Sequence, residues 1–300
     1  MLLATQKTVY KMTGNQPEVC YQNGTIQAIC ESNDRSAIVS DTGLTVTDKT
    51  ATSFTELPSS DQVETVDILD DGTVLIGTEG PHIYQVSDGQ LNLLEAFETL
   101  ECRDDFYTPW GGPASVRSFA HTDDGWVYAD IHVGSIVRSP DRGKSWELVT
   151  PDLHEDVHQV ATHPRQRDAL FANTANAVYI SEDRGNTWEH RSEGFPYYYG
   201  RAIAVHPEDG DCLLATVSRG PHSNVDGRLY RSDDRGRTWS HVTSGFPEST
   251  PSNIDTFQIA FTTDGRAWAA LDRELLVSDN RGQSWTPIWT SPDPIKTIAS

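Results

Sequence analysis

Residues that could bind or cleave a sugar gather in three connecting segments of the chain. Residues 103–112 hold Arg, Asp, Phe, Tyr and Trp side chains, residues 154–156 hold His, Glu and Asp, and residues 197–200 begin with three tyrosines. Carboxylates can act as acid and base on a glycosidic bond while aromatic rings stack on the sugar. Shorter loops add Glu79, His82, His132, Arg219 and His222. Carbohydrate chemistry is one interpretation and ordinary polar surface loops are the other, so no catalytic residue is assigned.

A repeated motif shows which elements must position these segments. Four stretches follow the pattern S-x-D/N-x-G-x-S/T-W and end at Trp146, Trp188, Trp239 and Trp285. The tryptophans fall 42, 51 and 46 residues apart, which is the size of one blade of a β-propeller. A degenerate copy of the motif at residues 47–54 has Phe54 at the Trp position. The period predicts a repeat architecture built from strands.

The motif has a physical role in a tight turn. Its Asp carboxylate can accept hydrogen bonds from backbone N–H groups, and its Gly can adopt the positive φ that such a turn needs. The last copy has Asn280 in place of Asp, and an amide oxygen can still accept those bonds. We expect the tryptophans to pack between neighbouring sheets, with no part in ligand binding.

Strand signals recur in the same order around each motif. Alternating apolar residues and regularly spaced turns are typical of four short strands per repeat. Six complete repeats begin near Thr25, Glu64, Val116, Val157, Arg201 and Ile254. The C-terminal strand 295–300 joins the N-terminal strands to complete a seventh and close the ring, which removes exposed sheet edges. The sequence predicts an all-β fold: one seven-bladed β-propeller domain of four-stranded blades over residues 1–300, WD40/YVTN-like in architecture.

These motifs resemble the Asp-box (BNR) repeats of the sialidase and sortilin superfamily, and the resemblance covers nearly the whole chain. Residues 130–134, 156–160, 218–222 and 253–256 are similar to prokaryotic cytosolic propellers loosely labelled sialidase-like or glycosyl hydrolase. In this superfamily the Asp-boxes stabilise turns away from the ligand site, so the resemblance implies a fold and not an activity. The N-terminal arginine motif of sialidases is missing and seven blades depart from their six, so true sialidase activity is disfavoured.

Alignment of the first strands places one polar residue per blade at the mouth of the central channel: Lys296, Gln27, Glu64, Arg117, His158, Arg201 and Asp255. Three positive charges there would attract an anionic group, which two of them, Arg117 and Arg201, can hold with paired N–H donors. The alternative is a hydrated channel with internal ion pairs. The predicted ligand-binding residues are Glu64, Arg117, His132, Asp156, His158, Tyr199, Arg201, Asp255 and Lys296.

A metal site is a weaker alternative. His132, Asp156 and His158 offer imidazole and carboxylate ligands that suit zinc and other divalent ions. No compact metal motif supports them, and histidines in loops also bond the backbone. We otherwise expect no cofactor.

Composition restricts the partners. The chain has 23 Lys and Arg against 44 Asp and Glu, a net charge of −21. Such an acidic surface is typical of halophilic proteins and argues against nucleic acid, which is held by clustered basic residues. No apolar stretch reaches the roughly 20 residues that span a bilayer. Residues 1–10 lack the features of a secretory signal, and the four cysteines show no paired spacing, so we expect a cytoplasmic protein with reduced thiols.

These observations support three functions. The leading one is a propeller that binds a small anionic or carbohydrate-like ligand, with glycoside hydrolase as the expected activity if it is an enzyme. The second is a non-catalytic scaffold that docks a protein partner. The third is a metal-dependent enzyme.

Overall fold

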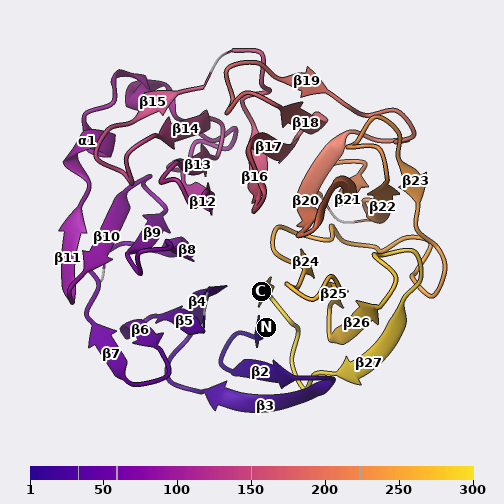
Figure 1. The fold of residues 1–300 in the computed structure, drawn as a ribbon, viewed down its shortest axis with the longest axis horizontal. Helices are drawn as coiled ribbons and strands as arrows, with labels where there is room; N and C mark the ends of the chain where they lie inside the picture. Colours follow the sequence, from indigo (N-terminus) through magenta and orange to yellow (C-terminus); the bar gives the residue numbers. More distant parts are fainter. Residues whose placement is uncertain (33, 59, 150, 223) are drawn as a thin grey trace. The chain divides into compact units, whose positions relative to one another are not determined.

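The computed structural model describes residues 1–32, 34–58, 60–149, 151–222 and 224–300. These residues form seven antiparallel sheets of four strands each, and the fold is a seven-bladed β-propeller, as the sequence predicts (Figure 1). The chain divides into two compact units, residues 1–148 with 296–300 and residues 149–295. A single domain over the whole chain stays a prediction.

The first unit contains four sheets. Their strands, in sheet order, are β28 (Thr297–Ala299), β1 (Leu2–Ala4), β2 (Val9–Thr13) and β3 (Gln16–Tyr21); β4 (Ile26–Ser32), β5 (Arg35–Ser40), β6 (Gly43–Thr47) and β7 (Thr52–Thr55); β8 (Val63–Ile68), β9 (Val74–Thr78), β10 (Ile83–Ser87) and β11 (Gln90–Leu93); and β12 (Val116–His121), β13 (Val127–Ile131), β14 (Ser135–Ser139) and β15 (Glu147–Leu148). The connection from β11 to β12 holds α1 (Glu95–Glu98) and the 3-10 helix η1 (Glu101–Asp105), where the sequence predicts no helix.

The second unit contains three sheets. Their strands are β16 (Val157–His163), β17 (Gln166–Thr174), β18 (Ala177–Ser181) and β19 (Glu189–His190); β20 (Tyr199–His206), β21 (Asp209–Ser218), β22 (Arg228–Ser232) and β23 (Ser240–His241); and β24 (Ile259–Phe261), β25 (Ala267–Leu271), β26 (Glu274–Ser278) and β27 (Thr286–Thr290). Within the described residues, no helix has the length and apolar character needed to cross a membrane.

The C-terminal strand completes the first sheet. β28 pairs antiparallel with β1, with Leu3 opposite Ile298, and Figure 1 marks the two chain ends beside each other in this sheet. The backbone N–H of Lys296 also donates to the carbonyl of Ala4 at 2.7 Å. The predicted closure by residues 295–300 is confirmed.

The Asp-boxes form the turns that their residues predict. In the box that begins at Ser139, the Asp141 carboxylate accepts a hydrogen bond from the backbone N–H of Ser145 at 2.8 Å, and Gly143 has a φ of +88°. Asn280 accepts the equivalent bond from Ser284 at 2.9 Å. All four motif tryptophans are buried, and the rings of Trp146, Trp239 and Trp285 pack against Phe97, Phe195 and Phe246.

Two details differ from the sequence prediction. Phe54 does not take the place of a buried Trp, because β7 begins five residues after Thr47 and leaves the Phe54 ring 53% exposed. The first strand of the sixth complete repeat, β24, begins at Ile259 and not near Ile254. The residues before it form a turn in which Phe257 has a φ of +61° and Gln258 donates its backbone N–H to the carbonyl of Asp255.

Candidate functional site

The inner strands of five sheets carry a β-bulge at the aligned polar position. In the first unit, the register of β4, β8 and β12 skips one residue at Gln27, Glu64 and Arg117. In the second unit, β16 skips His158, and β20 skips Arg201 together with Ala202. A bulge leaves a residue unpaired and redirects its side chain. The sequence alignment therefore identified residues that share one backbone irregularity.

Backbone links in the first unit bring the ends of four strands together. Glu79, which follows β9, donates its N–H to the carbonyl of Gln62 at 2.9 Å and forms a bridge with Ser115. His132, which follows β13, donates its N–H to the carbonyl of the same Ser115 at 2.9 Å. We call the residues at these strand ends, together with Trp110 of the loop before β12, the Glu64 site: Glu64, Glu79, Trp110, Arg117, Asp130 and His132.

Glu64 is a partly buried carboxyl group with one neighbour of each charge. The side-chain amide of Gln62 donates to its Oε1 atom at 3.0 Å. Burial raises the pKa of Glu64, the positive charge of Arg117 opposes the rise, and the negative charge of Glu79 adds to it. The net pKa is raised, so Glu64 keeps its proton to a higher pH than an exposed glutamate does. Glu79 itself is exposed.

Asp130 on β13 is fully buried, and the charge of Arg117 acts on it. The Ser118 hydroxyl donates to its Oδ1 atom, and its Oδ2 atom is buried without a hydrogen-bond partner among the described residues. Burial raises the pKa of Asp130 to about 7, against the opposing effects of Ser118 and Arg117. Asp130 is absent from the predicted ligand-binding residues. The available signal was a carboxylate inside the otherwise uncharged strand of residues 127–131.

The exposed indole ring of Trp110 lies beside His132 in the Glu64 site. Trp110 is 71% exposed, and its ring centroid lies 4.8 Å from that of the buried His132. The hydroxyl of Thr108 donates to the carbonyl of Gly112 at 2.7 Å, which closes the loop around Trp110. The exposed face of this indole is a flat apolar surface on which a sugar ring can stack.

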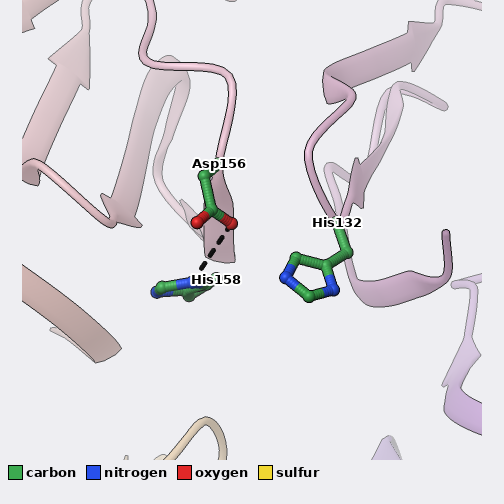
Figure 2. A group of neighbouring side chains, drawn as sticks. All are labelled: His132, Asp156 and His158. Carbon is green, nitrogen blue, oxygen red and sulfur yellow. Dashed lines mark ion pairs between the residues drawn. The ribbon is translucent and has the colours of Figure 1, made fainter. Parts of the chain in front are cut away.

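In the second unit, His158 is fully buried, and both nitrogens of its ring have a polar neighbour. Its Nδ1 atom donates to the carbonyl of Gly200 at 2.5 Å, and its Nε2 atom lies 3.2 Å from Oδ1 of Asp156 (Figure 2). The Tyr199 ring meets the imidazole edge-on, with 5.0 Å between centroids. These contacts hold the imidazole in one orientation.

The guanidinium of Arg201 is bound by the carboxylate of Asp255. Its Nε atom donates to Oδ1 of Asp255 at 2.5 Å, its second terminal nitrogen contacts the same oxygen, and the first donates to the Tyr199 hydroxyl at 3.3 Å. This is the internal ion pair that the sequence offers as the alternative to an anion site. The prediction that Asp255 lies on an inner strand is wrong, because it precedes β24 in the turn described above.

The remaining predicted residues are placed individually. Lys296 is exposed in the first unit, just before β28. The side-chain oxygen of Gln27 accepts the backbone N–H of Val63 at 3.2 Å, so Gln27 joins two sheets. His132 belongs to the first unit, whereas Asp156 and His158 belong to the second. A metal held by these three residues stays a prediction, as does ligand binding by the full set.

The repeated turns and the seven four-stranded sheets define the fold as a β-propeller with Asp-box turns. Its repeats are similar to those of sialidase/sortilin-like propellers. Residues 134–248 match the model of the Sortilin-Vps10 family, described as sortilin, neurotensin receptor 3.

Two curated proteins are similar in sequence to parts of the chain. A probable oligoxyloglucan-reducing end-specific xyloglucanase of Neosartorya fischeri is 25% identical over 221 residues, covering 57% of this chain and 26% of that protein. A xyloglucanase of Paenibacillus sp is 26% identical over 183 residues, covering 52% of this chain and 17% of that protein. The chain therefore spans about a quarter or less of the length of these relatives.

A solved structure shares the fold over almost the whole chain. The crystal structure of an ancestral GH74 enzyme matches with a TM-score of 0.66 at 16% identity, covering 97% of this chain and 40% of that one. At this identity the likeness concerns the fold alone.

Proposed function

We propose that the chain binds a carbohydrate at the Glu64 site and hydrolyses a glycosidic bond there. The observation that carries the proposal is the pairing of a partly buried glutamate of raised pKa, Glu64, with an exposed glutamate, Glu79, whose charge contributes to that rise. A carboxyl group that keeps its proton to a higher pH, placed near a second and exposed carboxyl group, is suited to serve with it as acid and base. The similarity to two xyloglucanases supports the same class of reaction.

In this mechanism Glu64 is the general acid and Glu79 the general base. The Glu64 proton passes to the glycosidic oxygen as the bond between that oxygen and the anomeric carbon breaks. Glu79 takes a proton from the water that attacks the anomeric carbon, so one water is consumed and two hydroxyl-bearing products leave. Solvent returns the proton from Glu79 to Glu64.

Arg117 and Trp110 bind the sugar. Arg117 acts electrostatically on both Glu64 and Asp130, and its guanidinium donates hydrogen bonds to sugar hydroxyls in this proposal. The exposed Trp110 ring offers a flat apolar face for a pyranose. The expected substrates are therefore oligosaccharides with a β-glucan backbone, as the names of the relatives indicate.

The test is the release of reducing ends from xyloglucan and cello-oligosaccharides. Glu64→Gln should lower kcat by about 10²–10⁴-fold, the usual contribution of a general acid. Trp110→Ala should mainly raise KM. Glu56→Gln, which changes an exposed glutamate outside the site, should leave both unchanged. Absence of hydrolysis by the wild-type protein, or full activity in Glu64→Gln, refutes the proposal.

A further inference from the structure

A groove runs beside β19 in the second unit. It encloses about 540 Å³ and is lined by aromatic and charged side chains that include His190, Glu193, Tyr198 and Arg237. Tyr198 is 51% exposed. The ring of His190 packs between two tyrosines, with centroids 4.8 Å from Tyr179 and 6.1 Å from Tyr198. The groove thus presents an aromatic wall to solvent.

The floor of the groove is held by the Asp-box of the next sheet. The backbone N–H of Trp239 donates to the carbonyl of Glu193 at 2.8 Å, and its indole N–H donates to the carbonyl of Arg191 at 3.0 Å. Phe195 stacks on the same indole, with 4.9 Å between centroids. Gly194 has a φ of +102°, and a side chain there would collide with the carbonyl of Trp239. The groove is therefore preformed.

The neighbouring repeat contains the same turn and the same His–Tyr stack, but it lacks three of the side chains that line the groove. His241 stacks on Tyr230 there as His190 does on Tyr179, and the backbone of Trp285 donates to Ser244 as that of Trp239 does to Glu193. At the equivalent positions, however, Tyr198 is replaced by Ser249, Glu193 by Ser244 and Arg237 by Gln283. The blade needs the turn but not these three side chains, so a structural role does not explain them.

The charges of the groove balance. Its lining includes two arginines and two glutamates, Arg191, Arg237, Glu189 and Glu193. A terminal nitrogen of Arg191 lies 2.7 Å from Oε2 of Glu189. A strongly anionic or cationic ligand would meet repulsion from one of the two signs. A neutral ligand with many hydroxyl groups would gain bonds from both, while its apolar faces stack on Tyr198.

We infer that this groove binds a neutral oligosaccharide segment. The site uses none of the residues of the Glu64 site, and its existence does not depend on hydrolysis there. A volume of about 540 Å³ lies within the range of small-ligand pockets. A peptide is the poorer occupant, because β19 has only two residues and offers little edge for strand addition.

The test is affinity electrophoresis in gels that contain xyloglucan, galactomannan, mixed-linkage β-glucan or soluble starch. It is performed on the full chain carrying Glu64→Gln, so that no polysaccharide is degraded. At least one gel should retard the protein. Tyr198→Ser should weaken that retardation by about ten-fold, the loss expected for removing a stacked aromatic ring. Adding Glu193→Ser and Arg237→Gln, which copies the neighbouring repeat, should remove all of the retardation that remains in a chain that also carries Trp110→Ala.

Matched variants separate the two sites. Because Ser249, Ser244 and Gln283 occupy the same turn in the next repeat, these changes should leave thermal unfolding unchanged. Trp110→Ala, in the Glu64 site, should leave Tyr198-dependent retardation in place. The inference is wrong if no gel retards the protein, if Tyr198→Ser is retarded equally, or if a casein digest competes as well as the oligosaccharide. Failure of hydrolysis alone leaves this result intact and refutes only the proposed reaction.

Discussion

The Nδ1 atom of His121 on β12 lies 2.7 Å from Oδ2 of Asp67 on β8, and the pair joins two neighbouring sheets of the first unit. Burial alone would lower the pKa of His121, but the charge and hydrogen bond of Asp67 outweigh it and raise the value to about 9. Asp70 and Asp71 act in the same direction. Burial would raise the pKa of Asp67, yet His121 lowers it overall.

The pair predicts a pH-dependent stability. The folded-state pKa of His121 lies above its unfolded value near 6.5, so its contribution is complete below pH 6.5 and is lost as the pH rises through about 9. The contribution of Asp67, whose pKa is lowered, is present above its unfolded pKa and is lost in acid. Urea unfolding should show a loss on the order of 3 kcal/mol between pH 6.5 and 10. His121→Gln should remove most of that slope, whereas His154→Gln should keep it.

The second prediction concerns the electrostatics of the Glu64 site. Since Arg117 lowers the pKa of both Glu64 and Asp130, Arg117→Met should raise both values. Carboxyl carbon NMR shifts followed against pH measure them directly and need no substrate. If the protein hydrolyses glycosides, the alkaline limb of its pH profile should move upward by about one unit. Unchanged carboxyl titrations in a folded Arg117→Met variant would show that Arg117 does not act on these groups.

The third prediction uses Asn280 as a natural comparison within the repeats. Asp183→Ala removes the acceptor for the backbone N–H and hydroxyl of Thr187, which lie 2.8 and 2.7 Å from its two oxygens. It should lower the free energy of unfolding by about 1–2 kcal/mol. Asp183→Asn should cost less, because Asn280 still accepts the N–H of Ser284. Equal losses in urea titrations of both variants would contradict this account.

The fourth prediction concerns Arg201, whose guanidinium is bound by Asp255. Asp255→Asn removes that negative charge and should increase phosphate affinity several-fold, as measured by isothermal titration calorimetry at low salt. The double change Asp255→Asn with Arg201→Met should cancel the gain. If Asp255→Asn gains nothing, the guanidinium does not serve as an anion site even when unpaired.

The repeated features were predictable because a local pattern determines them. The Asp-box places its acceptor, its positive-φ glycine and its tryptophan within eight residues, so Asp141 and Gly143 could be assigned without knowledge of the rest of the fold. The inner strands could be aligned for the same reason. The shared bulge at Glu64 and Arg117 shows that this alignment had the correct register.

The errors arose where long-range contacts decide the outcome. The turn before β24 depends on the positive φ of Phe257, which its residue type does not indicate. Phe54 fits the spacing of a motif whose turn is shortened in the structure. The pKa of Asp130 is raised because its carboxyl group is completely buried, against the opposing effects of Ser118 and Arg117. The alternation of residues along a strand does not distinguish a buried carboxyl group from an exposed one.

The backbone bulge is the same in four inner strands, whereas the side chain that it carries differs from strand to strand. The bulged residues carry four different functional groups: the amide of Gln27, the carboxyl group of Glu64, the guanidinium of Arg117 and the imidazole of His158. Because the distortion tolerates such different groups, one blade can acquire a new side chain there while the others keep theirs. Mutation at these points can therefore change the polar group that a blade carries, except where the side chain itself joins strands, as that of Gln27 does with Val63.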